Sequence, residues 1–302
     1  MKRLGLLPGV GLVICCWLAG SAAAAERVLA IYLPSVFFGQ IERKLDLGNE
    51  LAAHLAKRPG EKFRPQVYAT LEAMEADFPR IGAALVESPY VAANLQRLLP
   101  VAVAFSASSA STRLAVLAVP SVKNLFDVKR TGLVFAAPLP VPNAFLENCV
   151  FEGELSLGSE NLMSARDVGS ALSLLSLHKA EAVLLYEEAL SSARIAGARP
   201  IYRSDKLPRP TFVLANRAAE AAEVSRLKEA LAVFSGRTHA DIQAFRPTTE
   251  QPYQKLRERM QHKPKHIPGL LDVTEEAVPW PTPQKDLPAP VQVPLRLFAP
   301  ES

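Results

Sequence analysis

The chain contains 302 residues, 49% of them hydrophobic and 21% charged, and its formal net charge is +4 at pH 7. This is ordinary globular composition in a chain long enough for two lobes rather than one core. Because no cluster of Lys and Arg is interleaved with aromatic residues, a nucleic-acid partner is excluded.

The N-terminus has the pattern of an export signal. Lys2 and Arg3 form a short basic region, residues 4–18 are apolar, and residues 20–25 are small. This order predicts a signal peptide over residues 1–25 that is cleaved after Ala25, so that Glu26 begins the mature chain. We therefore expect a periplasmic protein.

Two alternatives to a cleaved signal stay open. A retained membrane anchor is disfavoured because Pro8 and several glycines among the first twenty residues make a poor span. A lipoprotein is disfavoured because Ile14 and Trp17 flank Cys15 and Cys16, where a lipid-attachment motif has small residues. If both cysteines leave with the signal, a single cysteine remains, and the fold has to be stable without an internal disulfide.

Strands and helices alternate in the first part of the mature chain. Hydrophobic periodicity and turn residues predict strands at 27–33, 63–69 and 81–86, with helices at 38–57 and 70–78. Strand, helix, strand, helix, strand is typical of a parallel sheet covered on both faces. Two further strands, at 101–105 and 114–119, are expected to run on towards a second lobe.

A run of small hydroxyl residues separates those two strands. Residues 106–112 contain four serines and one threonine. They are candidates for a hydroxyl-lined site, but a solvated hairpin loop is the favoured interpretation because small polar residues are typical of turns.

The stretch from residue 113 to residue 143 organises the rest of the chain. After the strand at 114–119, Ser121 is placed to cap a short helix in which Leu125 and Val128 share one face. A second apolar strand follows at 132–136, then a loop that leads into a helix at 143–151. In open α/β sheets, ligands bind where such strands end.

The remaining elements continue the alternation. Strands are expected at 154–157, 182–186, 200–203 and 211–215, with helices beginning at Asp167 and near Ala189, at 222–235, and in one or two segments up to residue 260. Nine prolines lie between residues 264 and 302, which predicts an extended tail over 263–302.

The organising stretch resembles the second lobe of type II periplasmic solute-binding proteins, in their phosphonate, phosphite and phosphate branch. The residues that follow the family pattern are Ser121, Lys123, Leu125, Asp127, Val128, Lys129 and the strand Leu133-Val134-Phe135. Ser88-Pro89-Tyr90 is similar to a turn that lines the cleft in that family, with Glu87 where a glycine is usual. The resemblance covers roughly residues 27–245.

This resemblance implies an α/β, two-lobed fold with a mostly parallel sheet in each lobe. The first lobe is then expected at 26–117 and 211–262, and the second at 118–210. It also implies ligand-binding positions between the lobes, at Tyr32, Ser35, Thr70, Ser88, Tyr90, Asn143 and Ser170. Thr70 and Ser170 have helix capping as their alternative, and Tyr32 has a place in the core.

The family's oxyanion-binding loop corresponds to residues 137–143, where this sequence differs. Pro140 and Pro142 lack the N–H groups that Gly, Ser or Thr would offer. Losing two hydrogen bonds to a charged ligand weakens oxyanion binding by roughly 3–6 kcal/mol. A carboxylate at Glu87 would oppose an anion further, by about 4 kcal/mol at 4 Å, if its side chain pointed inward.

Signatures of catalysis are absent from the sequence. No nucleophile elbow, phosphate loop or dinucleotide motif occurs, and the five histidines are not grouped with cysteine or acidic partners. We therefore expect no enzyme, no cofactor and no bound metal. The resemblance implies a monomeric solute-binding protein of an ABC importer, of the phosphate/phosphonate-like family, with a permease as its partner. It would bind a small solute, anionic solutes included, in the cleft between the lobes by hinge closure. The alternative is an accessory protein that acts through a membrane sensor.

Overall fold

The computed structural model describes residues 27–58, 62–106, 109–125, 127, 135–137, 143–153, 155, 162–193 and 195–262. The expected signal peptide, the proline-containing loop at 138–142, most of the strand expected at 154–157 and the tail at 263–302 lie outside these residues. Among the helices within them, none combines the length and apolar composition needed to cross a bilayer.

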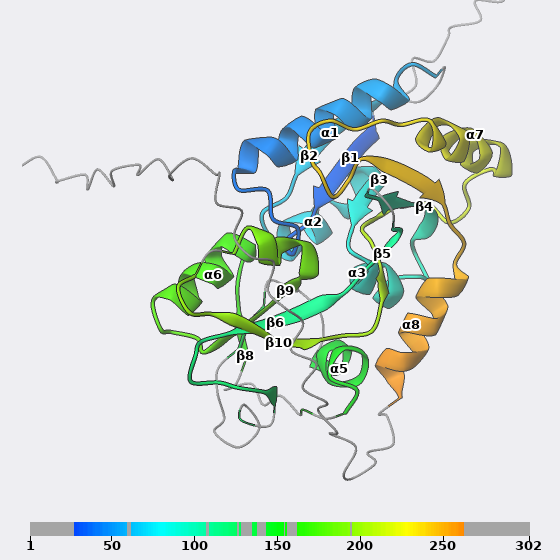
Figure 1. Cartoon of the computed structure of the whole chain (residues 1–302). Coiled ribbons are helices and arrows are strands. Elements are labelled where there is room, and N and C mark those ends of the chain that lie inside the picture. Colours follow the sequence, from blue (N-terminus) through cyan, green and yellow to red (C-terminus); the bar gives the residue numbers. More distant parts are fainter. Residues whose placement is uncertain are drawn as a thin grey trace, which may run out of the picture. The chain divides into compact units, whose positions relative to one another are not determined.

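The first sheet has six strands in the order β13-β4-β12-β3-β1-β2. Their bounds are β1 Arg27–Tyr32, β2 Phe63–Val67, β3 Ile81–Val86, β4 Leu99–Phe105, β12 Thr211–Leu214 and β13 Ala244–Pro247. All of β1 after its first residue is buried, as expected for a strand with both faces covered. This sheet and the helices packed on it are called the first lobe; its strands lie in the upper part of Figure 1.

Helices of the first lobe pack on these strands and on one another. They are α1 Ile41–Leu55, α2 Leu71–Ala76, α3 Ser88–Ala93, α7 Ala221–Ala232 and α8 Gln251–Gln261, with a 3₁₀ turn η1 at Phe78–Arg80. Contacts join α1 to β1, β2 and α7, and α3 to β12 and α8. The apolar residues Leu47, Leu51 and Leu55 recur near the helical period on α1 and are fully buried.

The second sheet has five strands in the order β10-β6-β9-β7-β8. Their bounds are β6 Leu114–Ala118, β7 Phe135–Ala137, β8 Leu162–Ser164, β9 Ala182–Tyr186 and β10 Arg199–Arg203. The associated helices are α5 Asn143–Phe145, the π-helix η2 Leu146–Val150, α6 Val168–Ser176 and the 3₁₀ helix η4 Glu187–Ser191. Together they form the second lobe, below the first in Figure 1.

The expectation of a mostly parallel sheet in each lobe is corrected to mixed sheets. In the first sheet β1 pairs in parallel with β2 and β3, whereas β12 and β13 pair antiparallel to their neighbours. In the second sheet β7 is parallel to β8 and β9, and β6 is antiparallel to β9 and β10. The parallel pairs β1–β2 and β1–β3 follow helices that return the chain, whereas β12 runs antiparallel to β3 and β4 after the chain comes back from the second lobe.

Two short strands carry the chain between the lobes. These are β5 Ser111–Thr112 and β11 Leu207–Pro208, which pair antiparallel with each other. The first lobe was expected to extend to residue 117, but β6 belongs to the second sheet, so the chain crosses at β5. The chain returns at β11, just before Thr211 begins β12.

Helix α8 contacts both lobes. It packs on α3 of the first lobe and on α5 and η2 of the second. The Asn148 side chain donates to the Met260 carbonyl at 2.9 Å, and Arg259 donates to the Cys149 carbonyl at 3.2 Å. These contacts fasten the last described helix to the second lobe.

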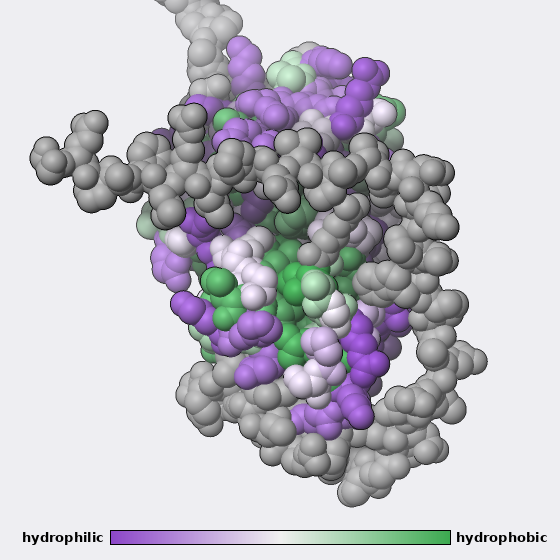
Figure 2. All heavy atoms as spheres, turned by 60° about the vertical axis from the view of Figure 1, so that its left-hand side comes forward, coloured by the Kyte–Doolittle hydropathy of each residue, from purple (hydrophilic) through white to green (hydrophobic). Residues whose placement is uncertain are grey.

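The described surface has few isolated apolar side chains. Leu45, Leu177 and Val233 are the large hydrophobic residues most exposed among the described ones. On one face, hydrophobic residues gather in the middle and hydrophilic ones surround them (Figure 2).

Candidate functional site

A cavity of about 300 Å³ lies between the loop after β1, the end of β2 and the start of α6. Tyr32, Phe37, Phe38 and Tyr68 supply aromatic walls from the first lobe. Strand ends and a helix start meet here, which is where α/β proteins bind ligands. The cavity is large enough for a small solute.

Charged groups lie on opposite walls of this cavity. Lys44 of α1 contributes from the first lobe, and Arg166 and Asp167 contribute from the second. Burial lowers the pKa of Lys44, while the carboxylates of Asp167 and Glu87 oppose that shift. The Lys44 ammonium also lies 5.4 Å from the centre of the Phe38 ring. Both signs of charge are thus present in one aromatic pocket.

Asp167 begins α6 and joins the cavity to the second lobe. Its carboxylate accepts the Ser170 N–H at 2.8 Å, so it caps the helix. The next N–H, from Val168, donates at 3.2 Å to the Pro34 carbonyl of the first lobe. The first turn of α6 is therefore already paired, partly with the opposite lobe.

Behind the cavity, Glu87 points inward and is buried, with 4% of its surface exposed. One carboxylate oxygen accepts the Ser35 N–H at 2.6 Å, and the other accepts the Ser35 hydroxyl at 2.9 Å. Burial raises the pKa of Glu87 to about 7, although the two Ser35 hydrogen bonds and the charge of Lys44 act against the rise. The charge of Glu87 also contributes to the raised pKa of Tyr32 and of Tyr186, the last residues of β1 and β9.

Three buried polar atoms near Glu87 and the crossovers have no hydrogen-bond partner within the described residues. They are the Ser88 hydroxyl, the Tyr186 hydroxyl and the Arg209 Nε. Buried polar groups are nearly always paired, so each unpaired one calls for a reason. All three atoms are buried, so only a water molecule or another group that enters the junction between the lobes could pair with them.

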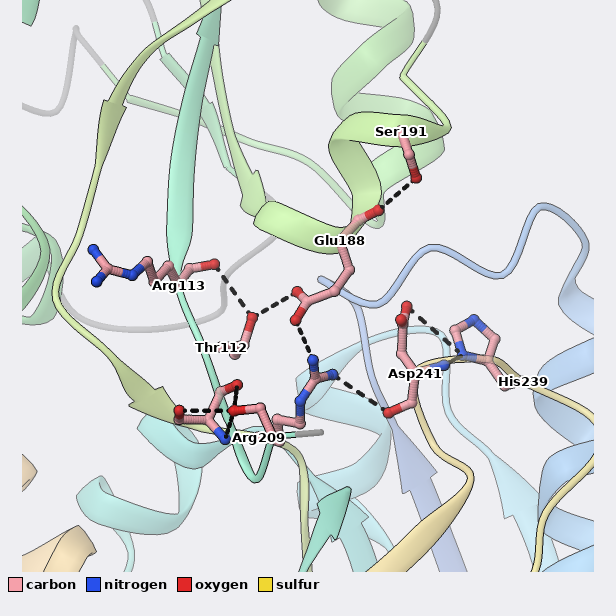
Figure 3. A network of polar contacts seen from close by, with 9 residues as sticks. Thr112, Arg113, Glu188, Ser191, Arg209, His239 and Asp241 are labelled. Carbon is pink, nitrogen blue, oxygen red and sulfur yellow. Dashed lines mark hydrogen bonds and ion pairs between the residues drawn. The ribbon is translucent and has the colours of Figure 1, made fainter. Parts of the chain in front are cut away.

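A polar network surrounds the crossovers (Figure 3). The Arg209 guanidinium is ion-paired with Glu188 of η4 and donates to the Asp241 carbonyl at 3.4 Å. Glu188 in turn accepts from the Thr112 hydroxyl of β5 at 2.6 Å. A small void of about 10 Å³ beside it, lined also by Ser35 and Tyr186, has room for one water molecule. Both crossovers and both lobes meet in this network.

His239 extends the network to the loop after β1. Its Nδ1 accepts the Asp241 N–H at 3.2 Å, so the neutral ring donates from Nε2 to the Phe37 carbonyl at 2.9 Å. The His239 and Phe38 rings also lie 4.3 Å apart. The aromatic wall of the cavity is thereby fixed to the region around the crossovers.

The expected site residues divide into three groups. Tyr32 lines the cavity, and Ser35 and Ser88 lie around Glu87. Tyr90 is buried, but its hydroxyl donates to Glu75 at 2.5 Å in a cluster with Arg97, and it does not line the cavity.

The other three expected residues lie at helix starts. Thr70 is exposed and its hydroxyl caps α2 by accepting the Ala73 N–H at 3.2 Å. Ser170 does not cap a helix; its N–H is bound by Asp167. Asn143 begins α5 and is exposed. Thr70 follows Ala69 and Ser170 follows Gly169, both of which line the cavity, whereas none of Thr70, Ser170 and Asn143 is itself among the lining residues.

Several residues of the site were not singled out from the sequence. Lys44 lies on a helix that was predicted from its apolar face alone, and nothing in that pattern indicated a role for Lys44. Tyr186 ends a strand of apolar residues and was therefore assigned to the core. Arg209 lies between Pro208 and Pro210. A lone cation within a proline-rich crossover was the signal that could have identified it.

Cys149 is buried in η2 with no exposed surface, and its thiol lies 3.8 Å from the Leu256 carbonyl. Burial raises the pKa of this thiol to about 11, so it is protonated at neutral pH. Among the described residues no group of three or more His, Cys, Asp and Glu side chains is placed to hold a metal ion.

Two α/β lobes joined by paired crossovers, with a cavity between them, define the type II periplasmic-binding-protein fold. Solved structures share it. A binding-protein component of an ABC phosphonate transporter from Pseudomonas aeruginosa has a TM-score of 0.62 at 10% identity, covering 78% of this chain and 85% of that one. PhnD1 from Prochlorococcus marinus, in complex with methylphosphonate, has a TM-score of 0.62 at 11% identity, covering 78% and 97%.

A further similar structure is a Xanthomonas citri protein bound to ATP, with a TM-score of 0.58 at 13% identity, covering 78% of this chain and 98% of that one. No family model matches the sequence, and no curated protein matches it. At these low identities the similarity shows the fold alone. The expectation of a two-lobed periplasmic-binding-protein fold is confirmed.

Proposed function

We propose that this protein binds a small solute in the cavity between its lobes and closes on it by hinge motion, as the periplasmic component of an ABC importer. The cavity itself is the observation that carries this proposal. Its walls come from both lobes, so a solute inside contacts both and favours the closed arrangement. The likeness to binding-protein components of ABC transporters supports a permease as the partner.

The walls of the cavity favour a compact solute with both apolar and polar parts. Four aromatic side chains supply apolar contact, and Lys44, Arg166 and Asp167 supply charges of both signs. Nothing in this arrangement is a nucleophile paired with a base, and the buried Cys149 lies elsewhere, in η2. Binding without catalysis is therefore the function that the geometry supports.

An accessory role through a membrane sensor is the second candidate. The observation that favours it is the degree to which the cleft is already filled by the chain's own contacts, since Glu87 binds Ser35 and Val168 binds Pro34. A protein of this kind would keep the fold and bind no solute.

A thermal-shift screen of the purified protein distinguishes the two candidates. We expect at least one small solute to raise the melting temperature, because saturation at 100 times the dissociation constant stabilises a protein by about 2.7 kcal/mol. The Lys44→Ala variant should lose most of this shift. Lys57→Ala, on an exposed residue just after the same helix, should retain it. No shift with any anionic, cationic, neutral or zwitterionic solute would favour the accessory role.

A further inference from the structure

The cavity between the lobes contains a cation without an ion-pair partner. Lys44 lines this cavity, and within the described residues its ammonium forms no ion pair and no hydrogen bond. It lies 5.4 Å from the centre of the Phe38 ring, and the carboxylates of Asp167 and Glu87 act on its pKa from beyond ion-pair distance. Burial lowers this pKa because it removes part of the water around the charge. An anionic group of a solute would supply the missing partner.

The two carboxylates that act on this cation already have partners of their own. Asp167 accepts the Ser170 N–H at 2.8 Å with one oxygen, and its other oxygen lies 3.5 Å from the Arg166 Nε. Glu87 is bound through both oxygens by Ser35 and does not line the cavity. Because both acids are occupied by groups of the chain itself, the cavity wall favours a solute that brings its own carboxylate.

Two further donors in the cavity wall are unpaired within the described residues. The Tyr32 hydroxyl has no hydrogen-bond partner there, although Tyr32 is only 6% exposed. Burial raises the pKa of Tyr32, so the hydroxyl keeps its proton and can donate. The Gly169 N–H, in the first turn of α6, also has no partner there, whereas the N–H groups on either side of it are bound. Free N–H groups at the start of a helix favour a negatively charged acceptor.

The apolar part of the wall consists of aromatic rings. They belong to Tyr32, Phe37, Phe38 and Tyr68. The Tyr68 hydroxyl donates to Asp77 at 2.9 Å, so this ring contributes apolar surface without a free polar group. Aromatic side chains pack favourably on a flat apolar group in offset or edge-on arrangements. The wall therefore suits a solute with a flat apolar body.

We propose that the solute of this cavity is a carboxylate with a flat apolar body, such as an aromatic acid. Its single negative charge matches the single unpaired cation, Lys44. The Tyr32 hydroxyl and the Gly169 N–H are the further donors available to the carboxylate, and one cavity of about 300 Å³ contains all three groups. This inference rests on the proposed solute-binding function and narrows it to one class of solute.

The test compares four small probes by calorimetry on the purified protein at pH 7.5. Benzoate has both the ring and the carboxylate. Benzylammonium and benzyl alcohol keep the ring and replace the anion by a cation or a neutral group, and acetate keeps the carboxylate without the ring. We expect benzoate to bind at least tenfold more tightly than each of the other three, since only benzoate satisfies both parts of the wall.

Lys44→Gln removes the charge and keeps a polar side chain. It should weaken benzoate binding at least tenfold and leave the affinity for benzyl alcohol within about twofold of wild type. Arg43→Gln is the matched control, because Arg43 is an exposed cation on the same helix that does not line the cavity. Its affinity for benzoate should stay within about twofold of wild type.

Tyr32→Phe decides the question if Lys44→Gln does not fold, because it removes a single hydroxyl and keeps the ring. It should weaken benzoate binding about tenfold, the effect of one hydrogen bond to a charged group, and leave benzyl alcohol binding less affected.

Benzylammonium binding as tightly as benzoate would overturn the inference, as would equal affinity of wild type and a folded Lys44→Gln variant for benzoate. Failure of all four probes to bind would overturn it too. In that case the proposed function stands if the broader thermal-shift screen finds another solute, and fails with the inference if no solute of any kind binds.

Discussion

Glu87 is a buried carboxylate whose pKa is raised by its surroundings. From the sequence alone it was noticed as a possible negative charge where a glycine is usual, but the direction of its side chain was not determined by any pattern. The fold turns it inward and surrounds it with Ser35, Tyr32 and Tyr186. The donors expected to face a solute at Ser35 are therefore satisfied internally.

A buried carboxyl with a raised pKa makes the stability of the protein depend on pH. The pKa of Glu87 is about 7 in the folded state against an ordinary value of 4.5. As pH rises from 4.5 to 7, the unfolded state releases this proton before the folded state does, so folding becomes less favourable. The stabilisation present below pH 4.5 is lost by pH 7, and its size is about 3 kcal/mol.

Glu87→Gln should remove this contribution. We expect the free energy of unfolding, measured by urea titration, to fall less between pH 4.5 and pH 7 in the variant than in wild type. Glu72→Gln should follow the wild-type curve in this window, because Glu72 is exposed. Parallel curves for wild type and Glu87→Gln would contradict the burial and protonation described for Glu87.

Among the elements, the two short crossover strands lie at the centre of a polar network that joins the lobes. β5 and β11 contain only two residues each, yet Thr112 and the neighbouring Arg209 connect to Glu188 of the second lobe and Asp241 of the first. Any opening of the lobes has to move Glu188 relative to these crossovers or carry it with them. The network therefore sets part of the cost of hinge motion.

Arg209→Ala should destabilise the protein markedly. The Arg209 side chain is 7% exposed, and its loss leaves the Glu188 carboxylate, itself 24% exposed, without its cation. We expect the free energy of unfolding to fall by about 3 kcal/mol, since an uncompensated charge remains partly buried. Chemical denaturation at pH 8 measures this change.

Arg80→Ala is the control for that measurement. Arg80 forms an ion pair with Asp77 at 3.1 Å, but its side chain is 63% exposed. Exposed pairs contribute about 1 kcal/mol or less. If Arg209→Ala cost no more than Arg80→Ala, the network would not have the structural role assigned to it.

At the scale of elements, the sequence predicted most strands and helices of the first lobe close to their observed bounds. Periodicity and capping residues such as Thr70 and Asp167 carry that information locally. The mixed pairing of the sheets was not predicted, because β12 pairs with β3 and β4, more than a hundred residues earlier, only after the chain has returned from the second lobe. The same holds for the site, where Lys44 and Asp167 meet only after both lobes are assembled.

At the scale of the whole molecule, two lobes face a common cavity and are already in contact across it. The Val168 N–H binds the Pro34 carbonyl, and α8 contacts α3 of the first lobe and α5 and η2 of the second. A solute that fills the cavity would add contacts to both walls at once. Binding of such a solute should therefore slow hydrogen exchange in both lobes rather than in one.

Hydrogen exchange with and without the solute that gives the largest thermal shift tests this most directly. The account predicts slower exchange in two separate segments together, the loop and helix start at 34–44 and the beginning of α6 at 166–170, since both line the cavity. Slower exchange confined to one of these segments, or located only on elements away from the cavity, would contradict binding between the lobes.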